Sequence, residues 1–347
     1  MAHVTVDICT KDRYLTTLPQ TLISVATQTR KPDYIVIYDD SANPIDIGAN
    51  ENLMYIFKLF DTKGIKWRHV WGKKLGQHFG HHMVQEEATE FIWRIDDDEV
   101  AEPNVLATLL SNFFEDGDET EDQIMNIGAV GGLVLMPGAS TEEPRQNTII
   151  DAMANKNYNC QWHFWKHPKP TMPVEHIYSS YLYRKGIQKY NTDLSPVAHR
   201  EETLHSYGIF KAGYKLIIDS RAVTWHFRSG TGGIRTGKQE DWFRDEITFH
   251  EVMNEYSGKL VAYLDSGMGD HVVFKTAVLP AIKKKYSDVT LAVCYPELFP
   301  GEKTISIAEG RNHCNPERHN ICRWMEINNW RDEMKYAYAA MYGVEIE

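Results

Sequence analysis

Short apolar runs alternate with segments of helical periodicity along the first part of the chain. Continuous apolar runs bounded by polar turns are typical of strands covered on both faces, and they occupy residues 4–9, 34–38, 65–70, 91–95 and 127–136. Between these runs, apolar residues recur at helical spacing over residues 15–28, 51–63, 75–89 and 103–114. This order predicts an open α/β sheet, in which ligands bind outside the carboxyl ends of the strands.

The pattern begins again near residue 256. A strand is predicted over residues 260–264, a glycine turn over 265–270, a helix from there to residue 286 and a second strand over 289–293. An amphipathic helix is predicted over residues 320–342. We therefore predict two domains, residues 1–255 and residues 256–347.

Acidic residues gather where the fourth predicted strand ends. Asp96, Asp97 and Asp98 directly follow the apolar run 91–95. Residues i and i+2 of an extended chain point the same way, so Asp96 and Asp98 can share one divalent cation while Asp97 points elsewhere. A solvated acidic turn is the alternative interpretation.

The composition is typical of a globular protein without membrane spans. The 347 residues are 42% hydrophobic and 24% charged, as in a globular protein with a proper core, and five scattered cysteines indicate reduced thiols. No apolar run approaches the roughly 18 residues that a membrane span needs, and the chain begins in a strand without a signal segment, so we expect a cytoplasmic protein. The net charge of −11 argues against broad binding of nucleic acid, although a local basic groove stays open.

Five short motifs, in this order, are similar to those of family 2 glycosyltransferases of the GT-A fold. They are Thr10 with Asp12-Arg13, Asp39-Asp40-Ser41, Asp96-Asp97-Asp98, Glu201-Glu202 before a helix ending in Lys211-Ala212-Gly213-Tyr214, and His226 on a late apolar strand. The resemblance covers roughly residues 1–235. It implies an α/β, GT-A nucleotide-sugar-binding sheet and a metal-dependent, inverting transfer of a sugar from a nucleoside-diphosphate sugar, with UDP as the expected carrier, to a hydroxyl acceptor.

The resemblance assigns a metal site to three of these side chains. Asp96 and Asp98 would contact the metal and the ribose, with Asp98 the more direct metal ligand. His226 would approach the same metal or the diphosphate. A divalent cation, Mn²⁺ or Mg²⁺, stabilises a departing diphosphate as a Lewis acid. A structural histidine at the end of a strand is the alternative for His226.

The remaining nucleotide contacts are also implied by the resemblance. Asp40 would read the edge of the nucleobase, Thr10 lies where the backbone turns around the base, and Asp12 and Arg13 belong to the same signature. Arg235 lies in a glycine-rich loop that would close over the diphosphate. For Thr10 and Asp40 the alternative is that these residue types simply favour turns at strand ends. For the loop that contains Arg235 the alternative is a flexible connector.

Glu202 is the predicted general base. An inverting transfer needs a carboxylate opposite the leaving group to accept the proton of the attacking hydroxyl. Aligned on the Lys-Ala-Gly-Tyr sequence, Glu202 falls where the family usually has a catalytic aspartate, and Glu201 takes the place of that residue's neighbour. The alternative role of this pair is to complement the dipole at the N-terminus of a helix.

The C-terminal βαβ unit resembles the beginning of heptosyltransferase-like GT-B proteins over about fifty residues, with a Gly-x-Gly-Asp turn at residues 267–270. We expect a small Rossmann-like accessory domain that binds the acceptor or forms an oligomer.

The motifs do not name the acceptor, for which a surface glycan or a lipopolysaccharide intermediate is the default. The aromatic segment 157–168 could stack on an acceptor sugar or base, or pack as a flap on the sheet. One alternative is a phage-type enzyme that glycosylates a hydroxymethylated base in DNA, which a basic cleft would favour; the candidates are Lys166, Lys169, Arg184, Lys185 and Lys189. A second alternative is a protein that binds a nucleotide sugar without turnover. It is favoured by Glu202, which stands where the family usually has a catalytic aspartate.

Overall fold

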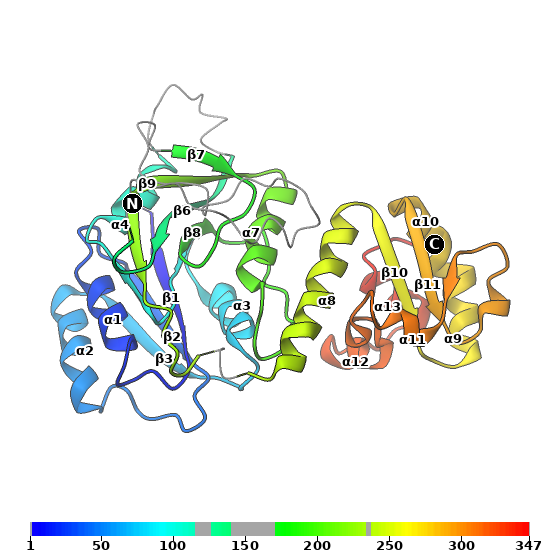
Figure 1. The fold of residues 1–347 in the computed structure, drawn as a ribbon, viewed down its shortest axis with the longest axis horizontal. Helices are drawn as coiled ribbons and strands as arrows, with labels where there is room; N and C mark the ends of the chain where they lie inside the picture. The colour runs from blue at the N-terminus through cyan, green and yellow to red at the C-terminus, as the bar shows by residue number, and fades with distance from the viewer. Residues whose placement is uncertain (1, 115–125, 140–170, 234–236, 347) are drawn as a thin grey trace. The chain divides into compact units, whose positions relative to one another are not determined.

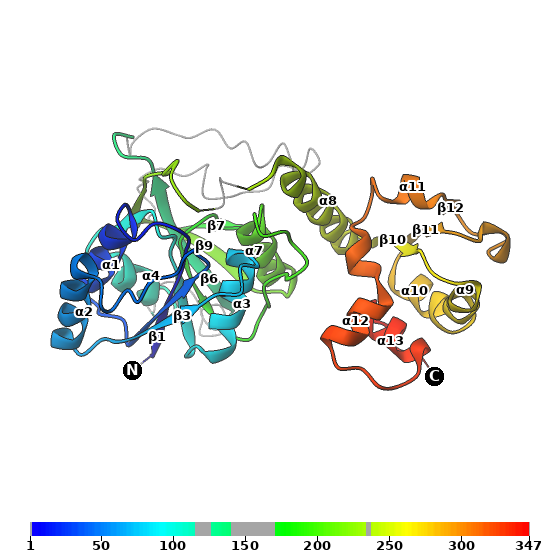
Figure 2. The ribbon, with the colours of Figure 1, turned by 90° about the horizontal axis from the view of Figure 1, so that it is seen from below.

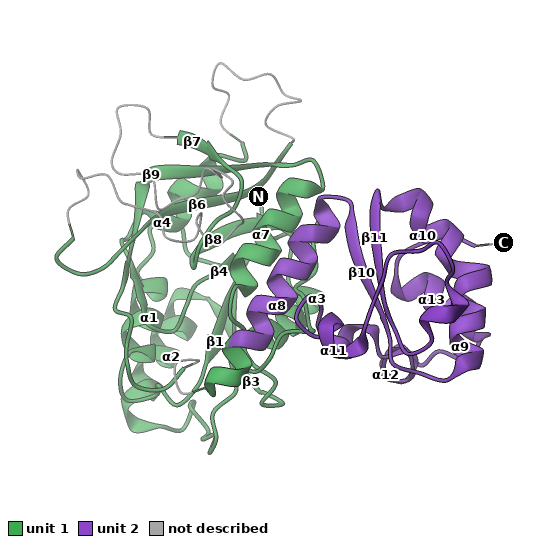
Figure 3. Cartoon of the chain, turned by 45° about the vertical axis from the view of Figure 1, so that its right-hand side comes forward, with its two compact units in different colours: residues 1–242 green, residues 243–347 purple. Residues whose placement is uncertain are grey.

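The computed structural model describes residues 2–114, 126–139, 171–233 and 237–346. These residues form two compact units, 1–242 and 243–347 (Figure 3). The division falls in the first turn of helix α8 (Gln239–Tyr256), whereas the predicted domain boundary lies at the end of that helix. The predicted aromatic segment 157–168 lies outside the described residues.

The first unit follows the predicted alternation of strands and helices. Its elements are β1 (Val4–Thr10), α1 (Leu18–Ala26), β2 (Tyr34–Asp39), α2 (Glu51–Lys63), β3 (Lys66–Trp71), α3 (Gln77–Glu87), β4 (Phe91–Arg94), β5 (Glu99–Ala101), α4 (Val105–Ser111), β6 (Ile127–Leu135), β7 (Thr171–Val174), β8 (Tyr181–Arg184), α7 (Glu201–Lys211) and β9 (Lys215–His226).

These strands form one open, mixed sheet in the order β3-β2-β1-β4-β8-β6-β9-β5, with β7 also paired to β9. Strands β3, β2, β1 and β4 are parallel, and β8 is antiparallel to both of its neighbours, β4 and β6. The carboxyl ends of β1, β2 and β4 therefore lie at one edge of the sheet. The α/β fold class predicted from the sequence is confirmed.

Helices cover both faces of this sheet (Figures 1 and 2). Successive side chains of a strand point to opposite faces. Accordingly, Val6 and Ile8 join a core cluster with residues of α1, α2 and α4, while Cys9 packs toward α3 on the other face. The same alternation in β4 sends Trp93 to the first cluster and Ile92 to the cluster that contains residues of α7. Arg94 thus points toward α7.

The second unit contains the predicted βαβ arrangement. Strands β10 (Lys259–Leu264), β11 (Asp288–Val293) and β12 (Thr304–Ile305) are parallel and pair in that order. The helical connection from β10 to β11 comprises α9 (Met268–Val273), a π-helical segment (Phe274–Val278) and α10 (Leu279–Lys285), and α11 (Ile307–Gly310) follows β12. None of the helices among the described residues combines the length and apolar character that a membrane span requires.

The predicted single helix over residues 320–342 is wrong. The structure has two helices, α12 (Ile321–Ile327) and α13 (Met334–Met341). Asn328 ends α12, and Asn329 follows with a φ of 50°. Asparagine tolerates this left-handed conformation better than most residues, so the chain turns here and Trp330 packs on the core of the unit.

A buried polar network fixes α8 to the rest of the second unit. Glu251 is 2% exposed; its Oε1 lies 2.6 Å from His319 Nε2 and 2.7 Å from Arg318 Nη1, and its Oε2 accepts from the Asn315 backbone N–H at 2.9 Å. Burial alone would raise the pKa of Glu251, but the charges of Arg318 and His319 lower it. This network explains why most of α8 belongs to the second unit.

Removing the charge from this network should destabilise the second unit. We expect Glu251→Gln to lower the free energy of unfolding by about 2 kcal/mol, because the buried network loses the carboxylate that pairs with Arg318 and His319. Arg318 keeps its second carboxylate partner, Glu255. Urea unfolding of the full chain measures the change. Glu326→Gln, on an exposed position of α12, is the control and should shift it by less than about 0.5 kcal/mol. Equal stability of the two variants would contradict the role of Glu251.

Candidate functional site

A cavity of about 430 Å³ lies in the first unit and contains most of the predicted site residues. Its wall includes Thr10, Arg13, Asp40, Asp96, Asp98, Glu202 and His226. Thr10 and Asp40 come from the ends of β1 and β2, and the acidic triplet follows β4. The sheet therefore brings together residues that are up to 216 positions apart (226 − 10).

Three of these side chains form a candidate metal site. The ligand atoms of Asp96, Asp98 and His226 all lie within 4.8 Å of one another. Strand pairing produces this arrangement, because His226 is the direct partner of Glu99 in the β5–β9 pair. His226 Nε2 is 3.2 Å from Asp98 Oδ1, and its Nδ1 is 3.8 Å from Glu99 Oε1. Burial opposes a charge on His226, yet the carboxylates of Asp98 and Glu99 raise its pKa.

The donor set fits a divalent cation. Carboxylate oxygens suit Mn²⁺ and Mg²⁺, and an added imidazole nitrogen favours a transition metal. A carboxylate that accepts from the second nitrogen of a ligating histidine is the usual support for such a ligand; Glu99 Oε1 lies on that side of His226, 3.8 Å from Nδ1, which is too far for a hydrogen bond.

The middle aspartate has a different partner. Asp97 Oδ2 accepts from the Thr10 hydroxyl at 2.7 Å, and its Oδ1 accepts from Arg13 Nη1 at 2.5 Å. Burial and the charge of Asp98 raise the pKa of Asp97 to about 6, despite the nearby Arg13. Arg13 also donates to the carbonyl oxygens of Ser229 and Thr231, at 3.2 and 3.0 Å. It thereby ties the acidic triplet to the loop after β9.

The structure describes Asp40 and Asp12, two of the residues predicted to contact the nucleotide, but not Arg235. Asp40 lies in the cavity wall, where its oxygens accept the backbone N–H groups of Lys74 and Gly76, each at 2.7 Å. Each of these oxygens keeps a second lone pair. Asp12 Oδ1 accepts from the Ala42 backbone N–H at 3.1 Å. Arg235 lies outside the described residues.

The two predicted catalytic glutamates have different surroundings. Glu202, in the first turn of α7, lines the cavity. Glu201 is 1% exposed and accepts from Arg94 Nη1 at 2.7 Å and from Gln77 Nε2 at 2.9 Å. This geometry makes Glu202 the accessible carboxylate and Glu201 a buried, hydrogen-bonded one.

Unusual backbone conformations are concentrated at this cavity. Among the described residues, seven non-glycine residues have positive φ, and six of these lie at the cavity or within two residues of its wall: Asp12, Lys74, Ser179, Ala198, Arg200 and Arg228. Such conformations persist only where the surrounding structure imposes them, and they cluster at functional sites. Gly76, with φ of 101°, leaves room for Pro196: a Cβ there would lie 2.7 Å from the Pro196 carbonyl oxygen.

Helix α7 is anchored below Glu202 by a buried neutral histidine. His205 Nδ1 lies 2.7 Å from the Tyr181 hydroxyl, its Nε2 lies 3.2 Å from the Gln188 carbonyl oxygen, and its ring stacks on Tyr190 with centroids 3.9 Å apart. An Nε2–H that donates to Gln188 leaves Nδ1 to accept from Tyr181. Burial lowers the pKa of His205 well below its usual value.

We expect this histidine to make the first unit sensitive to acid. A histidine whose folded pKa is depressed stabilises the fold fully above its unfolded pKa of about 6.5, and this contribution is lost as pH falls toward the folded value. Thermal unfolding from pH 7.5 to 5 should therefore show a falling Tm, and His205→Gln should flatten the profile. The exposed His313→Gln is the control; a profile that both variants leave unchanged would contradict the assignment.

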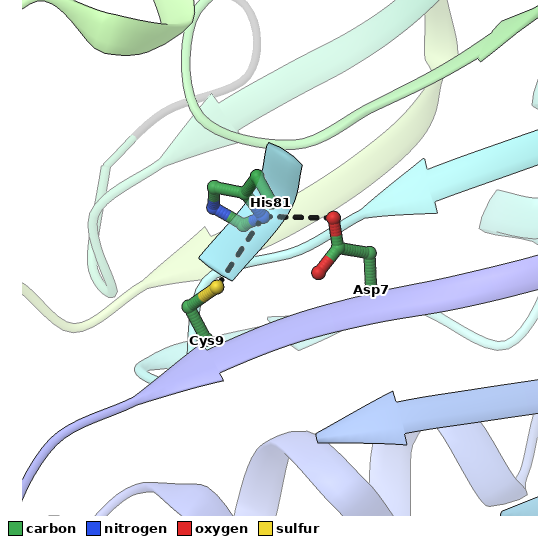
Figure 4. A group of neighbouring side chains, drawn as sticks. All are labelled: Asp7, Cys9 and His81. Atoms are coloured by element: carbon green, nitrogen blue, oxygen red, sulfur yellow. Dashed lines mark hydrogen bonds and ion pairs between the residues drawn. The ribbon is translucent and has the colours of Figure 1, made fainter. Parts of the chain in front are cut away.

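A second group of metal-ligating residue types lies beside the cavity (Figure 4). Asp7, Cys9 and His81 are all buried. Asp7 Oδ2 and Cys9 Sγ both approach the same ring nitrogen, His81 Nδ1, at 2.8 and 3.5 Å. A nucleophilic triad needs a histidine that bridges its two partners through different nitrogens, and burial raises the pKa of the Cys9 thiol well above its usual value. The geometry does not support a nucleophilic triad, and the contacts join α3 to β1.

Sequence reasoning missed three residues that contact the predicted site. Ser179 Oγ lies within hydrogen-bond distance of both Asp96 Oδ2, at 2.9 Å, and the Glu99 carboxyl group. Gln77 and Arg94 contact Glu201. Of these three residues, only Arg94 could have been identified from the sequence, because a charged residue inside the apolar run 91–95 needs a buried partner.

Comparison with solved structures identifies the fold. The structure of GalNAc-T7 with UDP, GalNAc and Mn²⁺ matches with a TM-score of 0.51 and 17% identity over 74% of this chain and 50% of that chain. S. aureus TarS matches at a TM-score of 0.42 and 11% identity, over 97% of this chain and 50% of TarS. TarS 1-349 matches at 0.41 and 13%, over 74% of this chain and 71% of that one.

The fold is that of GT-A glycosyltransferases, as the resemblance implied. The chain spans half the length of the GalNAc-T7 chain that it matches. No family model and no curated protein matches the sequence. The likeness of the C-terminal unit to heptosyltransferase-like proteins stays a prediction.

Proposed function

We propose that the chain is a metal-dependent, inverting glycosyltransferase that moves a sugar from a nucleoside-diphosphate sugar, with UDP as the carrier, to a hydroxyl acceptor. The observation that carries this proposal is a single cavity that contains both the Asp96–Asp98–His226 cluster and Glu202. GalNAc-T7, which shares the fold, was solved with UDP, GalNAc and Mn²⁺. We take Mn²⁺ as the preferred cation and Mg²⁺ as the alternative, because the cluster includes an imidazole.

The residues of the cavity suit a diphosphate leaving group. Asp96, Asp98 and His226 would hold the cation, which when bound supplies Lewis-acid stabilisation of the diphosphate. Lys11, Arg13 and Lys74 also line the wall and add positive charge to the cavity. Arg13 lies directly beside Asp97 and Asp98. Such fixed charges stabilise an anion that develops during bond cleavage.

The acceptor would enter beside α7. Glu202 lines the cavity there and would take the proton of the attacking hydroxyl while that oxygen forms the new bond to the anomeric carbon. Tyr178 and Trp242 also line the cavity, and aromatic faces suit a sugar ring. A surface glycan or lipopolysaccharide intermediate is the acceptor class we propose first.

The proposal is tested by the release of nucleoside diphosphate from a panel of sugar donors with Mn²⁺, with and without a chelator. We expect slow hydrolysis of one UDP-sugar that the chelator abolishes. If no donor is hydrolysed and none raises the Tm, the proposal is wrong. A duplex pull-down at low and high salt tests the DNA alternative, because contacts to phosphate weaken steeply with salt.

A further inference from the structure

Arg94 is an unusual residue for the centre of a sheet. It is the last residue of β4, between β1 and β8, and it is 0% exposed. Arginine is almost never fully buried unless it is paired. Its guanidinium lies 5.7 Å from the ring centroid of Tyr181, on the face of the sheet that α7 covers.

The guanidinium bridges the two parts of the candidate site. Its Nη2 donates to Asp96 Oδ1 at 2.6 Å, and its Nη1 donates to Glu201 Oε1 at 2.7 Å. Ser179 donates to the other oxygen of Asp96, and Gln77 donates to the same oxygen of Glu201. The residue after Glu201 is Glu202, so one buried cation joins the candidate metal cluster to the start of the helix that carries the candidate base.

We propose that Arg94 is a positioning residue that fixes the metal carboxylate Asp96 and the base Glu202 relative to each other. The inference rests on the proposed function. A guanidinium is a planar fork with fixed N–H directions, so it can hold two carboxylates at a set spacing. A lysine ammonium is a single point charge on a flexible stem and does not impose that spacing.

A merely structural ion pair would behave differently from a positioning residue. Removing one partner of a buried pair is strongly destabilising, but replacing both with neutral groups is often tolerated. Arg94→Met combined with Glu201→Gln neutralises the fully buried pair, and Asp96, whose side chain is 20% exposed, keeps its contact with Ser179. The double variant therefore tests function with a smaller loss of stability than Arg94→Met alone. If Arg94 only stabilises the fold, this double variant will be fully active.

The experiment compares wild type, Arg94→Lys and Arg94→Met/Glu201→Gln as full chains. Isothermal titration measures the Kd for UDP in the presence of Mn²⁺, hydrolysis of the UDP-sugar gives kcat and KM, and thermal unfolding gives Tm. We expect the double variant to keep a Tm close to wild type, to bind Mn²⁺–UDP about 10–100-fold more weakly, and to lose more in kcat than the change in KM accounts for. Arg94→Lys should fall between the two.

The matched control is Arg318→Lys, which alters the pair between a partly buried arginine and the buried Glu251 in the second unit. It should leave Kd and kcat unchanged even if Tm falls. Wild-type Kd and kcat in the double variant overturn the inference and leave the proposed function standing. Absence of Mn²⁺–UDP binding by wild type overturns both. If the double variant does not fold, Arg94→Lys is the deciding variant. Wild-type values of Kd and kcat for Arg94→Lys would then overturn the inference.

Discussion

Asp98→Asn should abolish Mn²⁺-dependent binding of UDP, with a loss of affinity greater than about 100-fold. Changes to groups that merely support a metal ligand already cost about 10–100-fold, and this change removes an anionic ligand. Asp98 Oδ1 faces His226 Nε2 at 3.2 Å, and its Oδ2 accepts the Ser229 backbone N–H at 2.9 Å. Asparagine has the same shape and can still accept from Ser229, so the loop should remain in place.

Titration of UDP into the variant with Mn²⁺ measures this effect, and wild type treated with a chelator should behave in the same way. Asp288→Asn is the matched control, because Asp288 is an exposed aspartate at the start of β11 in the second unit. Turnover of the donor should fall together with binding. Normal Mn²⁺–UDP binding by Asp98→Asn would remove Asp98 from the metal site.

The strands of the first unit were predictable because both of their faces are covered. Such strands appear as continuous apolar runs, and the five predicted runs correspond to β1, β2, β3, β4 and β6. The rule that ligands bind at the carboxyl ends of strands then placed Thr10, Asp40 and Asp96 at one edge. Their location in one cavity follows from the parallel pairing of β1 with β2 and β4.

The C-terminal helix was not predictable from periodicity alone. Apolar residues at helical spacing continue across the position where α12 ends, so the pattern favours one long helix. The interruption depends on backbone conformation at Asn328 and Asn329, which a hydrophobic pattern does not encode. The division of the two units likewise depends on contacts of Glu251 with His319, 68 residues away.

The supporting residues of the site were missed for a related reason. Ser179 reaches Asp96 across 83 positions of the chain, and Gln77 reaches Glu201 across 124. Serine and glutamine are common at such positions, so their types carry no signal until the fold places them. Asp97 was predicted to point elsewhere than Asp96 and Asp98. Its oxygens accept from Thr10 and Arg13, but Arg13 Nη1 also lies 3.2 Å from Asp98 Oδ1.

Glu202→Gln should leave donor binding intact and lower kcat by about 10²–10⁴-fold. A positioned general base contributes about that much to a reaction with proton transfer, and the amide cannot accept the proton of an acceptor hydroxyl. Glu202 lines the cavity without belonging to the Asp96–Asp98–His226 cluster. The Kd for Mn²⁺–UDP should therefore match that of wild type, and the loss should appear in transfer to an acceptor.

Glu202→Asp is the informative companion. It keeps the carboxylate and shortens its reach by one methylene, and a misplacement of about 1 Å can cost up to about 100-fold. We expect activity between wild type and Glu202→Gln, measured as sugar transfer with the donor identified by hydrolysis. Equal transfer rates for wild type and Glu202→Gln would assign the base to another residue. If wild type binds the donor tightly but transfers sugar to none of the acceptors offered, the result favours a nucleotide-sugar binding protein. The metal cluster and the cavity would then bind the donor without a general base that activates an acceptor.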